Sequence, residues 1–257
     1  MRSWLSIAVA STLTFFGVLA EGSPTWAAEI KVLSSNAMTD VMGDLVPEFE
    51  RTTGHKVVAT FEPTNAILSR IKAGESADVT ILIRQSIDEL RKSGKVVSGS
   101  EADLAKTSLG IAVRAGAPKP DISTVEAFKD AMLNAKSVAV SEVGASGLHF
   151  RRVLERLGIG EAMKPKLKIL PGATRTAELV AKGDAEAAVQ MMSELQPVSG
   201  AEIVGSLPGD LHYEILLTAA LDESAKEPAA GAALIKFLAS PTISPVLKKK
   251  GMEGAQS

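Results

Sequence analysis

The sequence predicts an α/β protein of two lobes, each built on a mostly parallel sheet flanked by helices. Short apolar runs of strand length alternate along the chain with segments whose apolar residues recur at helical spacing. Such alternation is typical of parallel strands joined by crossover helices. It is interrupted by the Gly- and Pro-rich segment 115–121 and then starts again. The interruption indicates where the chain crosses into a second lobe.

Three strand–helix pairs are expected in the first lobe. In the first helix, Val41, Leu45 and Phe49 recur at helical spacing, while Pro47 is expected to kink the helix and Gly54 to close it. The expected strands cover residues 29–35, 55–63 and 77–83, and the expected helices cover residues 38–54, 65–74 and 85–94.

A similar pattern fills the rest of the chain after a strand that starts at residue 107 and runs into the crossover. The expected helices cover residues 124–135, 147–158 and 175–183, and the expected strands cover residues 137–143, 166–170, 185–192 and 201–207. The strand 213–221 and the helices 227–240 and 244–251 are expected to return to the first lobe.

The expected division is therefore lobe 1 at residues 28–110 plus 213–257 and lobe 2 at residues 111–212. Two crossings between similar lobes make a hinged clamshell. Ligands of open α/β sheets bind beyond the carboxyl ends of the strands, which here means the cleft between the lobes.

The first 27 residues have the pattern of a cleaved secretory signal. Arg2 provides a positive start, residues 5–20 are apolar and uncharged, and small residues precede a cleavage point after Ala27. The alternative, an uncleaved anchor, is disfavoured because the apolar run is shorter than the about 20 residues that usually span a bilayer. We therefore expect an exported chain that is located in the periplasm.

Composition excludes several classes of function. The chain has no cysteine, so disulfides and thiolate chemistry are not available, and its three histidines are too far apart in sequence to suggest a zinc site. The formal net charge of −2 argues against nucleic acid as a partner. We expect no cofactor, no metal and a monomer.

The ends of the predicted strands are rich in groups that bind anions. Hydroxyls and glycine at helix N-termini leave backbone N–H groups accessible, and arginine adds a fork for carboxylate or phosphate. The candidate ligand-binding residues are Ser34, Ser35, Asn36, Thr64, Asn65, Arg84, Ser146, Gly147, Thr174 and Arg175. Each has an alternative explanation as a helix cap or a solvated charge, but their recurrence after strands of both lobes favours an anion site.

Several of these segments resemble the periplasmic molybdate-binding proteins of ABC transporters. The resemblance covers nearly the whole chain after the signal and is most specific in "NAILSRIKAGESADVTIL" and "VGASGLHFRRVLERLG". It implies the two-lobed periplasmic binding-protein fold, with a small oxyanion held by hydroxyls and helix N-termini. A transporter membrane component would then be a partner.

The ligand positions that the resemblance implies are only partly matched. The second hydroxyl falls on Thr64, and the two backbone donors of the other lobe fall on Ser146 and Thr174. The family's first serine falls on Ala37 and its tyrosine falls near Met191, and neither residue has a hydroxyl. Together with the added arginines, these departures point to a larger anion such as a di- or tricarboxylate.

An enzyme on the same clamshell is the alternative hypothesis. Bacterial aconitate isomerase also resembles the molybdate-binding proteins, and its reaction moves a proton between two carbons of an unsaturated tricarboxylate. Such a reaction needs arginines for the carboxylates and one acid/base group. The candidates for that group are His149, Glu142, Glu194 and Glu62.

Overall fold

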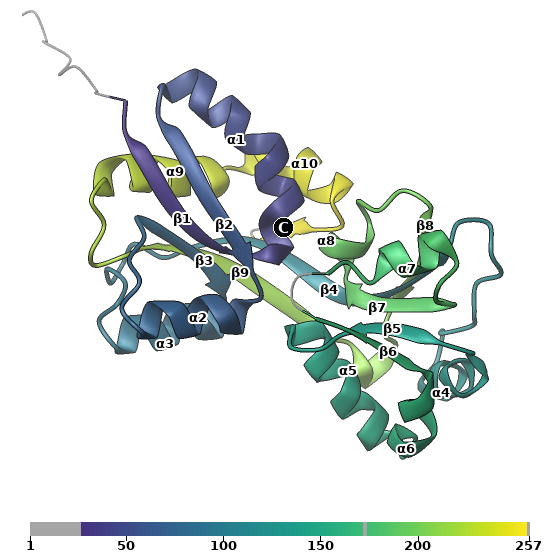
Figure 1. Cartoon of the computed structure of the whole chain (residues 1–257). Coiled ribbons are helices and arrows are strands. Elements are labelled where there is room, and N and C mark those ends of the chain that lie inside the picture. Colours follow the sequence, from purple (N-terminus) through teal and green to yellow (C-terminus); the bar gives the residue numbers. More distant parts are fainter. Residues whose placement is uncertain (1–26, 172–173, 256–257) are drawn as a thin grey trace, which may run out of the picture.

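The computed structural model describes residues 27–171 and 174–255, which form two α/β lobes joined by shared strands (Figure 1). The predicted signal peptide lies outside the described residues except for Ala27. The clamshell architecture predicted from the sequence is confirmed.

Lobe 1 contains the first and last parts of the chain. Its N-terminal elements are β1 (Glu29–Ser35), η1 (Asn36–Met38), α1 (Thr39–Thr53), β2 (Lys56–Glu62), α2 (Thr64–Lys72), β3 (Val79–Ile83) and α3 (Arg84–Lys92). Its C-terminal elements are β9 (Glu214–Leu221), α9 (Pro228–Leu238), η4 (Pro241–Ile243), α10 (Ser244–Lys249) and β10 (Glu253–Gly254).

Lobe 2 is formed by the middle of the chain, after the long strand β4 (Ala102–Arg114). Its elements are α4 (Val125–Asn134), β5 (Val138–Ser141), α5 (Ala145–Arg156), α6 (Gly160–Met163), η2 (Lys164–Lys166), β6 (Leu167–Leu170), α7 (Ala177–Lys182), β7 (Ala187–Met191), α8 (Met192–Leu195), β8 (Ala201–Ser206) and η3 (Gly209–Leu211). The short helices α6 and α8 were not predicted, because four residues are too few to show a period.

Strand β4 joins the two lobes. Residues 102–108 pair with β9 of lobe 1, whereas residues 109–113 pair with β7 of lobe 2. The continuous order of strands is β2-β1-β3-β9-β4-β7-β5-β6. A hydrogen bond of 2.8 Å from the Leu109 N–H to the Tyr213 carbonyl ties the two crossings together. We propose the division at residues 110/111 and 212/213, and the change of partners between Ser108 and Leu109 lies within two residues of the first of these points.

Each lobe has a parallel core with antiparallel strands beside it. Strands β1, β2 and β3 run parallel, as do β5, β6 and β7, while β4 and β9 are antiparallel to their neighbours. Parallel strands end at one edge of a sheet, so the loops after β1, β2, β5 and β7 all open toward the boundary between the lobes.

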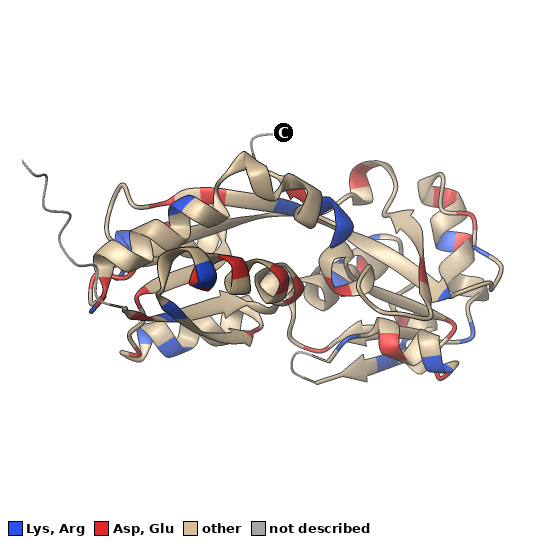
Figure 2. Ribbon diagram, turned by 90° about the horizontal axis from the view of Figure 1, so that it is seen from above, with Lys and Arg blue, Asp and Glu red and all other residues tan. Residues whose placement is uncertain are grey.

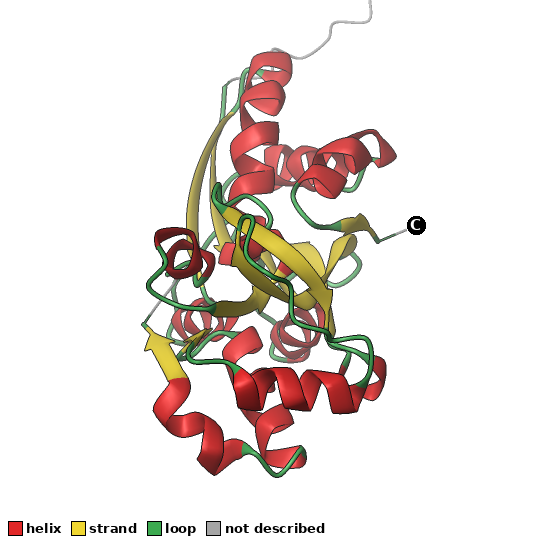
Figure 3. Ribbon diagram, turned by 90° about the vertical axis from the view of Figure 1, so that its right-hand side faces the viewer, coloured by secondary structure: helices red, strands yellow, loops and turns green. Residues whose placement is uncertain are grey.

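Helices cover both faces of the lobe 1 sheet (Figures 1 and 3). Alternate residues of β1 point to opposite faces. Val32 packs in the cluster that includes Val41 and Phe49 of α1, whereas Leu33 packs in the cluster with Ile67 of α2 and Ile87 of α3. All six side chains are at most 1% exposed, so the sheet is buried on both faces as predicted for parallel strands.

The helix α1 ends as the sequence predicts. Gly54 adopts a left-handed conformation with φ of 76° and closes the helix, and Pro47 lies within it. At its start, Ser35 caps the short helix η1 by accepting a hydrogen bond of 3.4 Å from the Ala37 N–H. The strand therefore turns into a helix within three residues, next to the boundary between the lobes.

Lys and Arg residues are interspersed with Asp and Glu residues along the ribbons of both lobes (Figure 2). Within the described residues, no single helix is long and apolar enough to cross a membrane. One bent pair of helices, Pro228–Leu238 and Pro241–Lys249, is together long and apolar enough for a membrane span. Leu234 and Leu238 of this pair, however, lie in the lobe 1 core.

A close approach between α5 and β5 makes Gly147 the least replaceable of the glycines that the structure describes in lobe 2. A Cβ atom on Gly147 would lie 1.8 Å from the backbone oxygen of Ser141. We expect Gly147→Ala to lower the free energy of unfolding by about 1–3 kcal/mol, because helix and strand must move apart. Urea denaturation measures the change.

Gly43→Ala is the matched control for this variant. Gly43 lies within α1, and a Cβ atom there would meet nothing within 4 Å. We expect this substitution to be neutral or to stabilise by up to about 1 kcal/mol, since alanine favours helix more than glycine does. Equal effects of the two substitutions would contradict the close packing of α5 on β5.

Candidate functional site

A narrow cavity lies between the lobes at the carboxyl ends of the parallel strands. Lobe 1 lines it with Ser35, Asn36, Ala37, Pro63, Thr64, Ile83 and Ile215, and lobe 2 lines it with Ser141, Gly144, Ala145, Ser146, Gln190, Met191 and Glu194. Its volume of about 20 Å³ has room for about one water molecule. The lobes are therefore nearly closed on one another, and a larger ligand requires them to separate.

The lobe 1 wall comes from two strand–helix junctions. Ser35 ends β1 and Asn36 begins η1, while Thr64 is the first residue of α2. The hydroxyl-bearing residues Ser35 and Thr64 are both buried. Their positions follow from the sequence, because a parallel strand that runs directly into a helix leaves its last polar residues at the edge of the sheet.

One part of the lobe 2 wall is the N-terminus of α5 and the strand end before it. Ser141 ends β5, and its hydroxyl accepts a hydrogen bond of 3.0 Å from the Gly144 N–H. Ala145 and Ser146 form the first turn of the 12-residue helix, where backbone N–H groups have no partner within the helix. These N–H groups and the helix dipole favour a negatively charged ligand.

A buried carboxyl group also lines the cavity. Glu194 is 8% exposed, and its Oε1 accepts hydrogen bonds of 2.8 Å from Asn36 Nδ2 of lobe 1 and from Gln190 Nε2 of lobe 2. Burial raises the pKa of Glu194 to about 7, although Arg175 and the hydrogen bonds from Gln190 and the Met191 backbone favour the ionised form. An acid of this kind can hold or release a proton near neutral pH.

An ion pair crosses the cleft beside this acid. Arg175, just before α7 in lobe 2, contacts Asp40 of α1 in lobe 1 at 2.5 Å between Nη2 and Oδ2. About three quarters of each side chain is buried. Arg175 therefore faces the opposite lobe, but it pairs with Asp40 and does not line the cavity, where it was expected.

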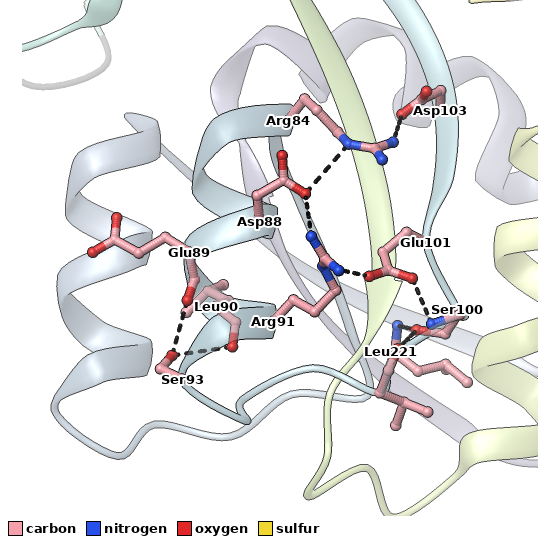
Figure 4. Close-up of polar contacts among 12 residues, drawn as sticks. Arg84, Asp88, Glu89, Leu90, Arg91, Ser93, Ser100, Glu101, Asp103 and Leu221 are labelled. Carbon is pink, nitrogen blue, oxygen red and sulfur yellow. Dashed lines mark hydrogen bonds and ion pairs between the residues drawn. The ribbon is translucent and has the colours of Figure 1, made fainter.

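Arg84 does not reach the cavity, contrary to expectation. Its guanidinium pairs with Asp103 at 2.6 Å and with Asp88 at 3.6 Å, and Arg91 joins Asp88 to Glu101 in the same network (Figure 4). The two nearby carboxylates hold Arg84 on the outer part of lobe 1. Within the described residues, no Lys or Arg side chain lines the cavity.

Four other predicted ligand residues lie near the cavity without lining it. The Ser34 hydroxyl is buried and donates to the Ser35 carbonyl, and Asn65 is exposed on α2. Gly147 is buried against Ser141. Thr174 is exposed, and its hydroxyl donates to the Pro171 carbonyl.

Three of the four acid/base candidates lie outside the cavity. His149 stacks on Tyr213 at 4.1 Å between ring centroids, and burial lowers its pKa. Glu142 is exposed, and Glu62 pairs with Arg70 of α2. Only Glu194 is brought into contact with the other site residues.

Gln190 is a lining residue that sequence reasoning missed. Its Oε1 accepts hydrogen bonds of 2.8 and 2.9 Å from the N–H and hydroxyl of Thr176, while its Nε2 donates to Glu194. A signal was present, because Gln190 is a polar residue within the otherwise apolar strand 187–191. Such a residue must find buried partners or face a site.

Comparison with known proteins identifies the family of this chain. Residues 30–253 match the model of the bacterial extracellular solute-binding protein family. The chain belongs to this family. Among its relatives, this solute-binding protein is 33% identical to the aconitate isomerase of a Pseudomonas species, over 94% of this chain and 95% of the relative.

Two further comparisons connect the solute-binding protein to molybdate-binding proteins. It is 30% identical to the molybdate-binding protein ModA of Azotobacter vinelandii, over 88% of this chain and 90% of the relative. A solved periplasmic molybdate-binding protein of the same organism has a TM-score of 0.71 at 19% identity, covering 87% of this chain and 98% of that chain. The structural match supports the fold, and the sequence match supports a protein of the molybdate-binding type.

The raised pKa of Glu194 should make stability depend on pH. The unfolded carboxyl ionises near its ordinary value of 4.5 and the folded one near 7, so between these values the folded state binds more protons and stability falls as pH rises. We expect this contribution to cost about 3 kcal/mol above pH 7 and nothing below about pH 4.5.

The variant Glu194→Gln removes this titration while keeping the shape of the side chain. Its free energy of unfolding relative to the parent should therefore increase between about pH 4.5 and pH 7. Denaturant titrations of both proteins across this range measure the difference. A difference that stays constant with pH would contradict the raised pKa.

The Asp40–Arg175 pair should favour the closed arrangement of the lobes. We expect Arg175→Ala to raise the ratio of open to closed protein about fivefold, corresponding to about 1 kcal/mol for a partly exposed pair. Distances between labels on cysteines introduced at exposed Lys92 of α3 and Lys164 of η2 measure this ratio, since the chain has no native cysteine.

Arg84→Ala is the control for this measurement. Arg84 pairs with Asp88 and Asp103, both on the lobe 1 side of the cleft. Its removal should leave the distance distribution as in the parent. An unchanged distribution in Arg175→Ala as well would show that the ion pair across the cleft has no role in closure.

Proposed function

We propose that this protein binds a small anion between its lobes in the periplasm and delivers it to the membrane component of an ABC transporter. The observation that carries the proposal is the cavity itself, in which the N-terminus of α5 from lobe 2 faces the hydroxyls of Ser35 and Thr64 from lobe 1. Residues with neutral polar groups line the same cavity from both lobes, so a ligand that contacts both walls would stabilise the closed form. The proposed signal peptide agrees with export.

The positions without hydroxyls bear on the class of anion. Ala37 and Met191, where the family resemblance implies a serine and a tyrosine, both line the cavity. Two neutral donors to a tetrahedral oxyanion are therefore replaced by apolar groups. We propose that molybdate binds weakly and that the preferred ligand carries more than one carboxylate.

Opening of the lobes makes a cation available for such a ligand. In the closed structure Arg175 is neutralised by Asp40 across the cleft. When the lobes separate to admit an anion larger than the present cavity, this pair breaks, and Arg175 becomes free to pair with a ligand carboxylate. This exchange of partners gives Arg175 a role in ligand binding without requiring it to line the closed cavity.

A second function, isomerisation of aconitate, is favoured by Glu194 and by the 33% identity to an aconitate isomerase. In that reaction Glu194 would remove a proton from the methylene carbon next to the double bond. The double bond shifts, and the same proton returns to the carbon at its other end, so no atom is gained or lost. A carboxyl group with a pKa near 7 is suited to both steps.

One set of measurements tests both functions. Calorimetry and thermal shift are run with molybdate, tungstate, sulfate, phosphate, cis-aconitate and trans-aconitate, and proton NMR follows each aconitate isomer over time. A ligand at 100 times its Kd should stabilise the protein by about 2.7 kcal/mol. Tight binding of an anion without turnover supports the binding protein, whereas interconversion of the isomers supports the enzyme.

Three variants test whether the binding or turnover measured takes place in the cavity. Arg175→Ala should weaken aconitate binding about tenfold or more, because a carboxylate loses its charged partner, while Arg84→Ala should bind as the parent does. If turnover is found, Glu194→Gln should abolish it without preventing binding. Failure of every anion to bind, or equal binding by both arginine variants, would contradict the proposed site.

A further inference from the structure

An acidic side chain in an anion site requires an explanation. Glu194 contributes its carboxyl group to the same small cavity as the α5 N-terminus and the hydroxyl of Ser146. An ionised Glu194 and a bound anion would lie together in a water-poor space, where like charges repel strongly. The protonated form carries no charge and adds a hydrogen-bond donor instead.

The hydrogen bonds from Gln190 and the Met191 backbone favour the ionised form of Glu194, but the side-chain donors leave one of its oxygens able to carry a proton. Both side-chain donors, Asn36 Nδ2 and Gln190 Nε2, converge on the single oxygen Oε1 at 2.8 Å. Within residues 27–171 and 174–255, Oε2 receives no side-chain donor. A carboxylic acid with its carbonyl oxygen on Oε1 and its hydroxyl on Oε2 fits this arrangement.

The charges near Glu194 do not replace the need for a proton. Arg175 and Asp40 are the charged groups that act on it, and they form an ion pair with each other. The other elements packed against α8 present neutral groups or charges that are already paired. These are Asn36 of η1, Gln190 of β7, Thr107 of β4, Lys106 of β4 paired with Glu214, and Glu202 of β8 paired with Lys119.

We propose that Glu194 binds the ligand as a neutral acid, donating its proton in a hydrogen bond to an oxygen of the anion, so that each anion is taken up together with one proton. This inference rests on the proposed function and specifies the chemistry of the same cavity. It selects ligands that present a hydrogen-bond acceptor to α8. It also makes affinity depend on pH in a direction that an all-neutral site would not show.

The Kd should rise with pH because anion binding is coupled to protonation of Glu194. Burial already raises the pKa of Glu194 to about 7 in the empty protein, and a bound anion raises the pKa further because it disfavours the ionised form. Binding then needs no extra proton below about pH 7 but must recruit one above it. The measured Kd should be constant below about pH 7 and rise about tenfold for each pH unit above it.

The experiment measures the Kd of trans-aconitate and of molybdate between about pH 6 and pH 9, where the charge of each probe is constant. Calorimetry at pH 8 in buffers of different ionisation enthalpy gives the number of protons taken up. We expect close to one proton for each anion bound by the parent and a Kd about 50-fold weaker at pH 9 than at pH 7.

The variant Glu194→Gln keeps the oxygen acceptor for Asn36 and Gln190 and supplies a permanent N–H donor. It should bind the probe with a Kd independent of pH and without proton uptake, and above pH 8 it should bind more tightly than the parent. Glu178→Gln, an exposed substitution on α7 next to Lys182, should retain the pH dependence of the parent.

The possible results distinguish failure of proton-coupled binding from failure of anion binding itself. A parent Kd that does not change with pH, or no proton uptake, would overturn the proton-coupled binding and leave the anion site intact. Loss of binding by a folded Glu194→Gln at every pH would also overturn it, because the carboxylate would then act as an ionised acceptor. Failure of the parent to bind either probe at any pH would overturn both this inference and the proposed function.

Discussion

The structure depends on one constraint, the sharing of strand β4 between two sheets. Because residues 102–108 pair with β9 and residues 109–113 pair with β7, neither lobe can complete its sheet without the other. The crossing sets the parallel cores so that their carboxyl ends face one boundary. The cavity, the ion pair across it and the buried acid all lie there as a consequence.

The proposed site combines groups that would stabilise an anion without a fixed positive charge. The α5 N-terminus supplies partial charge, Ser35, Thr64 and Ser146 supply short polar groups, and the cation Arg175 is held by Asp40 of the opposite lobe. A full cation that faced the cavity permanently would favour any anion. We propose that Arg175 exchanges Asp40 for a ligand carboxylate when the lobes open, which favours an anion that contacts both lobes.

Local sequence patterns predicted some of the site residues, whereas contacts between residues far apart in the chain could not be predicted. The strand ends at Ser35, Thr64 and Ser146 were predicted as site residues because period and capping patterns mark where strands turn into helices. Arg84 satisfies the same local rule, yet Asp88 and Asp103 hold it away from the cavity. Asp103 lies on β4, 19 residues further along the chain, so no local pattern could reveal that pairing.

The sequence by itself determined the α/β class, the two crossings and the junctions that form the walls, because hydrophobic period and turn residues act over short distances. Only the tertiary structure decided which of the four acid/base candidates lines the cavity. These candidates are Glu62, Glu142, His149 and Glu194. Glu194 lies on a helix too short to show a period, and its pKa is raised by burial between lobes whose residues are far apart in sequence. Desolvation is a property of the packed molecule, and it cannot be read from neighbours along the chain.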